Sequence, residues 1–459
     1  MLRITTSKSV QAAQHYFDHA LTKGDYYLEG QEISGDFGGI AAQWLKLDGA
    51  VDKQTFDALL NNRRPDGSRL TARDNPNRRP GYDFTFDVPK SVSVLHAITG
   101  DARLVEAMQR AVQETMAEIE KAMHCRVRKH GAFEDRLTGN MVWAPFTHFT
   151  TRPADASSAL AEGVPDPHLH MHVYALNATF DPKEKQWKAG EFSRIKRDAS
   201  YYQAAYHVRL AGHFQRLGYE VAATKDAFEI AGIPKSLTER FSRRTDHINA
   251  LAVEKGIIDA KQKAELGAKS RRNKRHDFSL PELREAWTKA LTGGECGLLH
   301  KVSAEAERRD GQAAMIDARA TRHGLDFALE HELARVSETS EKRLLGSALK
   351  HAVGKTSVER MEAELTAKPG LLRANIGGEA RLSTQAVLRE EKELLRLARS
   401  GRGRCRPLVP EDYHFQEALF RDPDKDTAEQ KAGVLHVLKS QDWVVGLVGR
   451  AGSGKTTLL

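Results

Sequence analysis

The sequence predicts a chain that mixes helices and strands over its first ~290 residues and is mainly helical over the next hundred. Short runs at 82–88 and 170–180 alternate apolar and polar side chains, a pattern typical of strands with one buried face. A segment between them, 104–123, carries apolar residues at helical spacing. From 300 to 400 charge is dense, aromatic residues are scarce, and Ala, Leu, Glu and Arg dominate, which indicates helices.

The length and composition are typical of a soluble protein with two or three domains. The chain has 459 residues, of which 40% are hydrophobic and 29% are charged. No stretch approaches the roughly 18 apolar residues that a membrane span requires, and the N-terminus has no secretory signal, so we predict no membrane insertion. The three cysteines lie far apart, which favours a reducing cytoplasm. The net charge of +8 favours a polyanionic partner.

Changes in composition divide the chain into three predicted parts. The first part covers residues 1–295 and ends with a basic stretch at 270–276 and a helix that we expect to begin at Ser279, where Pro281 and Glu282 suit the first turn. A helical segment follows over 296–400. After a flexible connection at 400–404, a globular part covers 401–459.

A cluster of histidines indicates a metal site. His168, His170 and His172 alternate along a predicted strand and point to one face, while the residues between them face the core. The outer two lie roughly 13 Å apart and cannot share one ion, so the ligand pair is either 168/170 or 170/172. The third ligand must come from elsewhere, and His148 is the nearest candidate, on what we expect to be a neighbouring strand. A row of solvated or core histidines is the alternative.

Neutral imidazoles suit manganese, nickel, copper or zinc better than magnesium. Three histidine ligands with open positions would still let a divalent ion act as a Lewis acid on a phosphate oxygen.

Tyrosines near the N-terminus are candidate nucleophiles. Tyr16 precedes a phenylalanine, and Tyr26 and Tyr27 stand ten residues further on. Such pairs are usually core aromatics, but a tyrosine oxygen can also attack phosphorus and form a covalent phosphotyrosine. Because the pKa of tyrosine is near 10, the attack needs a base or a nearby cation, and a metal site meets that need.

An acidic residue shares the polar face of the strand at 82–88. Alternation places Asp83, Thr85 and Asp87 on that face and the aromatic residues between them in the core. If the histidine strand lies beside this one, Asp83 is expected to accept a ring N–H and fix the tautomer of a ligand, or to take the tyrosine proton. A solvated acid is the alternative.

These motifs together resemble the relaxase domain of the MobF family of conjugative relaxase–helicases, within the HUH endonuclease superfamily. The resemblance rests on the tyrosine pairs and on five motifs in the family's order: GYDFTFDVPKSVS at 81–93, LTGN at 137–140, FTHFTTR at 146–152, DPHLHMHVYALN at 166–177 and FSRRT at 241–245. The segment at 340–365 and the P-loop described below are similar to the start of the family's helicase region. The resemblance implies an α+β fold whose antiparallel sheet is flanked by helices.

The same resemblance implies the function of a conjugative DNA relaxase. Such enzymes nick one strand at a plasmid origin of transfer, beside a hairpin, and keep a 5′-phosphotyrosine and a free 3′-hydroxyl. Relaxosome accessory proteins and a type IV secretion coupling protein are the implied partners, and Mg²⁺ or Mn²⁺ is the implied ion.

Matched residue by residue, the resemblance makes Tyr16 the first nucleophile and Tyr26 the second, although Tyr27 fits the spacing almost as well. It makes Asp83 the supporting acid and assigns the metal to the three ligands His148, His170 and His172. This chain departs from the family in having Phe17 after the first tyrosine, His168 where a glutamine is expected, and a small-residue insertion at 153–163.

The C-terminal end carries a P-loop motif. Gly449, Gly454, Lys455 and Thr456 satisfy GxxxxGK[ST], in which backbone N–H groups cradle phosphates, the lysine reaches the outer ones and the threonine holds magnesium. The apolar run at 443–448 is predicted to be the buried strand before the loop. Because the sequence stops soon afterwards, we expect no ATPase activity from these residues and ATP with Mg²⁺ only in a longer relaxase–helicase.

Basic residues are the candidate phosphate contacts, with a solvated charged face as the alternative for each. They are Arg243, Arg244, Arg271, Arg272, Lys274 and Arg275.

Three other functions remain open from the sequence. The first is a rolling-circle replication initiator with the same chemistry. The second is a DNA-binding protein whose metal site is structural or decayed. The third is a P-loop motor with a DNA-docking domain.

Overall fold

The computed structural model describes residues 2–449 apart from 8, 15–16, 18–31, 73–77, 130–131, 154–156, 158–159, 226, 270–277, 312, 314–315 and 415–427. Two compact units divide the chain. Unit 1 contains residues 1–332 and 341–367, and unit 2 contains residues 333–340 and 368–459. Within the described ranges, no helix combines the length and apolar character needed to cross a bilayer.

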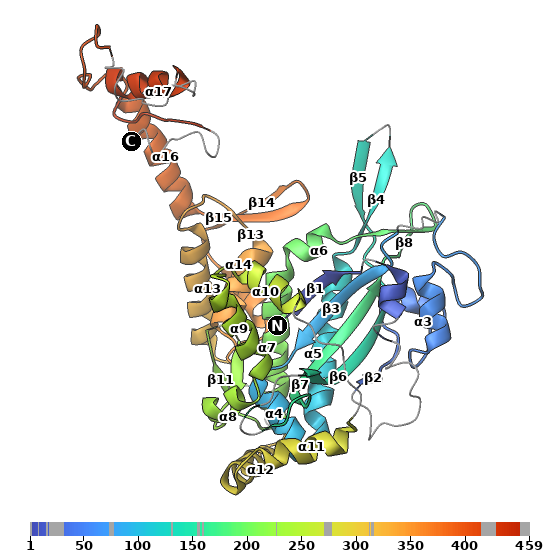
Figure 1. Cartoon of the computed structure of the whole chain (residues 1–459). Coiled ribbons are helices and arrows are strands. Elements are labelled where there is room, and N and C mark those ends of the chain that lie inside the picture. Colours follow the sequence, from blue (N-terminus) through green and yellow to red (C-terminus); the bar gives the residue numbers. More distant parts are fainter. Residues whose placement is uncertain are drawn as a thin grey trace. The chain divides into compact units, whose positions relative to one another are not determined.

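A five-stranded antiparallel sheet forms the centre of unit 1 (Figure 1). The strands lie in the order β1-β3-β7-β6-β2, so the two central strands of the histidine motif, β7 and β6, pair with each other. Their bounds are Leu2–Thr6 for β1, Glu32–Ser34 for β2, Gly81–Asp87 for β3, Trp143–Pro153 for β6 and Pro165–Leu176 for β7. Helices accompany this sheet, so the expected α+β architecture with an antiparallel sheet is confirmed.

Three long helices cover one face of the sheet. They are α4 (Lys90–Thr99), α5 (Ala102–Lys121) and α7 (Ala199–Arg216). Phe84 and Phe86 of β3 are fully buried on this side, where the Phe86 ring meets Tyr206 of α7 at 5.0 Å. Helix α5 agrees with the predicted segment at 104–123, because its apolar residues recur on one face and Asp101 caps its N-terminus.

The opposite face of the sheet is packed by the N-terminal region. Helices α2 (Ile40–Trp44) and α3 (Lys53–Leu60) share a core with side chains of β6 and β7. The Phe17 ring lies at the middle of this core, stacked on Phe146 of β6 at 4.3 Å and edge-on to Tyr174 of β7 at 5.5 Å. The histidines of β7 lie on this same face, because side chains two apart along a strand point the same way.

Smaller elements surround the main sheet in unit 1. The strands are β4 (His124–Lys129), β5 (Ala132–Leu137), β8 (Thr179–Asp181), β9 (Gln186–Lys188), β10 (Gly190–Glu191), β11 (Val221–Ala223) and β12 (Phe228–Ile230). The helices are α6 (Ser193–Arg197), α8 (Lys235–Arg240), α9 (Arg243–Glu254), α10 (Ala260–Lys269), α11 (Leu280–Lys289), α12 (Gly293–Arg308), α13 (Ala318–Leu333), α14 (Glu341–His351) and α15 (Val358–Ala367). Unit 1 therefore continues past residue 295, where the composition changes.

Helix α11 begins where its sequence predicts. Ser279 accepts a hydrogen bond from the backbone N–H of Glu282, and the Glu282 carboxylate accepts one from the backbone N–H of Ser279, which is a complete capping box. The indole N–H of Trp287 donates to the Pro165 carbonyl at 2.9 Å. This bond ties α11 to the first residue of the histidine strand.

In its described residues, unit 2 contains a small sheet and two helices. The strands β13 (Thr339–Ser340), β15 (Glu379–Thr384) and β14 (Leu371–Ile376) lie in that order, and the helices are α16 (Gln385–Ser400) and α17 (Ala428–Lys439). The β14–β15 hairpin interrupts a region that composition predicts to be helical. Gly377 and Gly378 both have positive φ at its turn, which is the conformation that a tight hairpin requires.

The predicted strand at 443–448 is wrong. These residues form no strand, and Trp443 and Val448 are 54% and 99% exposed. A buried strand needs neighbours that satisfy its backbone and cover its side chains, and among the described residues no strand pairs with this run.

Candidate metal centre and substrate cleft

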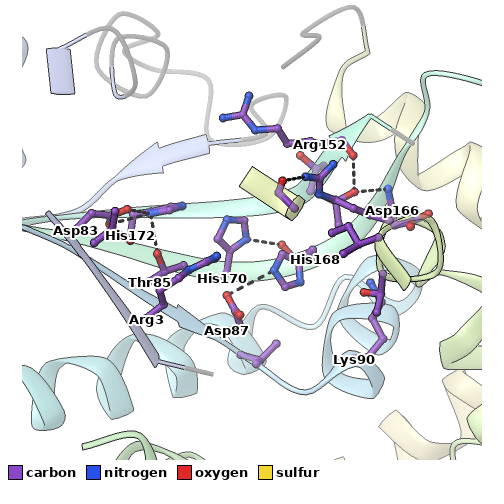
Figure 2. Close-up of a pocket in the computed structure, with 18 of the residues that line it drawn as sticks. Arg3, Asp83, Thr85, Asp87, Lys90, Arg152, Asp166, His168, His170 and His172 are labelled. Carbon is purple, nitrogen blue, oxygen red and sulfur yellow. Dashed lines mark hydrogen bonds and ion pairs between the residues drawn. The ribbon is translucent and has the colours of Figure 1, made fainter. Parts of the chain in front are cut away.

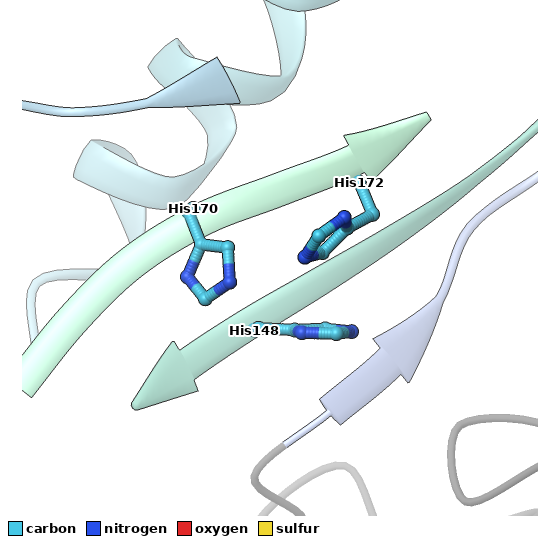
Figure 3. A group of neighbouring side chains, drawn as sticks. All are labelled: His148, His170 and His172. Carbon is cyan, nitrogen blue, oxygen red and sulfur yellow. The ribbon is translucent and has the colours of Figure 1, made fainter. Parts of the chain in front are cut away.

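Three histidine side chains from two neighbouring strands converge on one point. His148 of β6 is the cross-strand partner of His170 of β7, and His172 follows two residues later on the same face (Figure 3). The three rings are buried, and each offers a nitrogen within 4.8 Å of the others. The structure thus brings together the pair 170/172 and His148, on the neighbouring strand that the sequence predicts.

Hydrogen bonds orient two of these rings. Nδ1 of His172 lies 2.8 Å from a carboxylate oxygen of Asp83, and Nδ1 of His170 lies 2.9 Å from the carbonyl oxygen of His168. Since oxygen acceptors require a proton on Nδ1, the Nε2 atoms of both rings remain as ligands. Burial and the imidazoles of His168 and His172 hold the pKa of His170 well below its usual range, which favours the neutral form that binds metal.

The donor set fits a divalent transition ion. Imidazole nitrogens with a carboxylate behind one of them are the surroundings in which proteins hold such ions, and three ligands leave open positions for a substrate oxygen. His168 does not belong to this group. Its Nε2 instead lies 3.5 Å from Asp87, whose carboxyl pKa is lowered because the hydrogen bond and charge of His168 outweigh burial.

A cleft of about 940 Å³ opens over the histidines. Its floor includes Asp83, Thr85 and Asp87 of β3 and the histidines of β7 (Figure 2). Helices α9 and α10 contribute further lining residues. Five cationic side chains line it: Arg3, Lys90, Arg152, Arg244 and Lys263.

The two predicted arginines of α9 differ in their surroundings. The Arg243 side chain is 9% exposed and donates to the buried Asp166 carboxylate at 2.7 Å and to the Val164 carbonyl at 2.6 Å. Arg244 donates to the Gly267 carbonyl at 2.9 Å and lines the cleft. The geometry therefore favours Arg244 over Arg243 as a phosphate contact.

Several predicted site residues lie outside the described part of the chain. They are Tyr16, Tyr26, Tyr27, Arg271, Arg272, Lys274, Arg275, Gly454, Lys455 and Thr456. Gly449, the first residue of the P-loop motif, is described and exposed.

Lys90 and Asp166 also line the cleft, although no role for either residue is predicted from the sequence. The sequence position of each residue could have indicated such a role. Asp166 lies two residues before His168, on the same face of the strand, and Lys90 follows directly on the strand that carries Asp83.

Comparisons with known proteins agree with this geometry. The family described as TrwC relaxase matches residues 10–293. Two curated relatives, both the multifunctional conjugation protein TraI, come from Escherichia coli and from its strain K12. They are 33% and 32% identical over 303 residues, which is 63% of this chain and 16% of each relative. The chain thus spans only a small part of their length.

Solved structures of the conjugative relaxase TrwC are also similar. The metal-free complex with oriT DNA has a TM-score of 0.55 at 30% identity and covers 65% of this chain and 99% of its own. The complex with a 27-mer DNA comprising the recognition hairpin and the cleavage site has a TM-score of 0.54 at 29% identity, with coverage of 65% and 99%. The copper-bound complex has a TM-score of 0.53 at 28% identity, with coverage of 67% and 98%. Since the family match covers more than half of its residues, this chain belongs to the TrwC relaxase family.

Proposed function

We propose that this chain is a conjugative DNA relaxase that nicks and transfers one DNA strand at a plasmid origin of transfer. The observation that carries the proposal is the group of His148, His170 and His172, two of which line the cleft, with Asp83 hydrogen-bonded to His172. TrwC, whose solved complexes contain oriT DNA, and TraI, a conjugation protein, support the choice of substrate.

Tyr16 is our proposed first nucleophile. Its neighbour Phe17 is 1% exposed, and the Phe17 ring lies 6.2 Å from the ring of His172. Tyr26 or Tyr27 would serve the second transfer. The resemblance to the family supports both assignments.

The proposed reaction exchanges one phosphoester for another. The tyrosine oxygen bonds to phosphorus, the bond from phosphorus to the 3′-oxygen breaks, and that oxygen leaves as a hydroxyl once it has gained a proton. His148, His170 and His172 would hold a divalent ion, manganese or magnesium, which would withdraw charge from a phosphate oxygen. Asp83 keeps the proton of His172 on Nδ1, so that Nε2 would be the atom available to hold the ion.

The DNA strand is proposed to lie along the cationic cleft. Arg152 and Arg244 line it and are placed to contact phosphates. Arg271, Arg272, Lys274 and Arg275 remain candidates on the basis of the sequence alone.

We propose three parts along the chain. Residues 1–295 are the relaxase domain, residues 296–400 are a linking segment, and residues 401–459 are the start of a P-loop helicase region. ATP and Mg²⁺ would act there only in a longer protein. Relaxosome accessory proteins, a type IV secretion coupling protein and a bacterial cytoplasmic location remain proposals from the family.

The test is covalent trapping. We would incubate the chain with a randomised single-stranded DNA library and Mn²⁺ or Mg²⁺, isolate SDS-resistant protein–DNA adducts, and locate the modified peptide by mass. We expect an adduct on Tyr16 that disappears on chelation and in His170→Ala but persists in His168→Ala, the matched control outside the ligand group. Tight binding without an adduct under either metal would favour a DNA-binding protein with a structural metal site.

A further inference from the structure

A second polar site lies in the same cleft, beyond the histidine group. Asp166 and Lys90 both line the cleft, on the opposite side of His170 from Asp83 (Figure 2). Asp166 is four residues before His170 on the same face of β7, so the two Cα atoms are about 13 Å apart. That distance is too long for Asp166 to reach an ion held by the histidines. A nucleotide next to the one at the histidine group could reach Asp166.

Asp166 has unused hydrogen-bonding capacity. Its side chain is fully buried, and Oδ1 accepts the bond from Arg243 at 2.7 Å. The other oxygen, Oδ2, is buried with no donor among the described residues. Because a buried carboxylate oxygen without a donor is costly, it indicates a group that donates to it when the cleft is filled.

Lys90 supplies the complementary chemistry. Its ammonium donates to the Pro167 carbonyl at 2.8 Å, which uses one of its three hydrogens. Burial lowers the pKa of Lys90 to about 8, against the opposing charges of Asp166 and Asp87, so the group is still mainly protonated at neutral pH. The side chain is half-buried and borders the cleft, where its other hydrogens can reach a bound molecule.

The two groups together select the class of ligand. A phosphate offers only acceptors, so Oδ2 of Asp166 would repel it. A nucleobase edge offers an acceptor for Lys90 beside an N–H for Asp166. Guanine and thymine both place a carbonyl beside a ring N–H. Guanine fits best, because its N7 gives Lys90 a second acceptor next to O6, and its N2–H gives Asp166 a second donor next to N1–H.

We propose that Lys90 and Asp166 form a base-reading subsite, in which Lys90 donates to O6 and Oδ2 of Asp166 accepts N1–H of an unpaired guanine near the scissile phosphate. The proposal rests on the proposed function and adds to it a determinant of the nick-site sequence. Arg243 is a positioning residue in this subsite, because its bond holds the carboxylate with Oδ2 turned away from it.

The experiment compares base preferences of the full chain and its variants. Single-stranded DNA from a randomised library is selected for adduct formation and sequenced. The wild type is expected to show a guanine preference of about tenfold or more at one position near the nick. Lys90→Met is expected to lose that preference at that position only. Lys263 of α10 lines the same cleft and provides the matched control. Lys263→Met is expected to weaken the binding of all sequences alike.

Asp166→Asn provides a second variant that reverses the chemistry. With an amide N–H in place of Oδ2, the chain is expected to lose its preference for guanine, because the amide N–H and guanine N1–H would both be donors. Thermal melting of both variants checks folding, and Lys90→Met, which leaves the Asp166–Arg243 pair intact, keeps the test decisive if Asp166→Asn unfolds.

Base analogues test the contact from the DNA side. Inosine keeps O6 and N1–H and should bind like guanine, whereas 2,6-diaminopurine lacks both and should bind like any mismatched base. In Lys90→Met the diaminopurine substitution should cause a smaller loss than in the wild type, because only the contact with Asp166 is left to be broken. The subsite is overturned if Lys90→Met leaves the selected sequence unchanged, which is the result expected of a site filled by water. It is also overturned if Lys90→Met weakens the binding of all sequences equally and reduces the salt dependence of binding, which is the result expected of a phosphate contact. Failure of the proposed function would look different, because the wild type itself would form no adduct.

Discussion

A carboxylate oxygen of Asp83 lies 2.8 Å from Nδ1 of His172, across the pairing of β3 with β7. The bond fixes the tautomer of His172, so Asp83→Asn should lower the affinity for Mn²⁺ about 10- to 100-fold. Titration calorimetry with the purified chain measures the affinity for Mn²⁺. Asp135→Asn, a change of the same kind on β5, is the control, and equal affinities for the two variants would contradict the prediction.

The adjacent arginines of α9 should give different phenotypes. Arg244→Ala should reduce the slope of log affinity against log salt by about 0.7, the value for one phosphate contact with single-stranded DNA. Arg243→Ala should instead destabilise the fold by about 3–5 kcal/mol, because it leaves the buried Asp166 carboxylate without its partner. Fluorescence anisotropy at several salt concentrations and urea unfolding distinguish them. The same effect from both variants would refute the assignment.

Stability should fall in mild acid because of His96. This buried ring stacks on Phe149 at 5.5 Å, and burial, followed by the charge of Arg284, lowers its pKa to about 4. Between pH 6.5 and 4 the unfolded chain binds a proton that the folded chain does not, so folding stability is present above pH 6.5 and declines below it. The loss approaches about 3 kcal/mol at pH 4.

Urea unfolding at pH 7 and pH 5 measures this dependence. His96→Phe keeps an aromatic ring against Phe149 and removes the titrating group, so its stability should change less over the same interval. A variant that follows the wild type at both pH values would show that other groups are responsible.

Replacing Trp287 should loosen the start of the histidine strand. Trp287→Phe keeps most of the packing but removes the donor to the Pro165 carbonyl, at a cost of about 1–3 kcal/mol. In Trp287→Phe, the rate of amide hydrogen exchange should rise relative to the wild type in residues 165–170, and should rise less in β3. Thr288→Val, on the same helix, provides the comparison, because the Thr288 hydroxyl donates only within α11. Equal exchange rates in the two variants would argue against the link.

The sequence predicted those parts of the site that depend on local geometry. Alternation along a strand placed Asp83, His170 and His172, and a second strand motif supplied His148. The role of Asp166 could not be predicted in this way, because its partner Arg243 lies 77 residues away on a helix whose docking no local pattern encodes. The wrong strand at 443–448 has a related cause, since an apolar run becomes a strand only where other strands pair with it.

The order of the strands in the main sheet has a consequence for folding. The first two strands of the chain, β1 and β2, occupy opposite edges, and the three strands between them all come later in the sequence. Most of the pairings that build the sheet are therefore long-range, and such contacts form slowly because a long loop must close first. The histidine group, which depends on the pairing of β6 with β7 and on the Asp83 strand beside them, can assemble only once most of the first 176 residues are available.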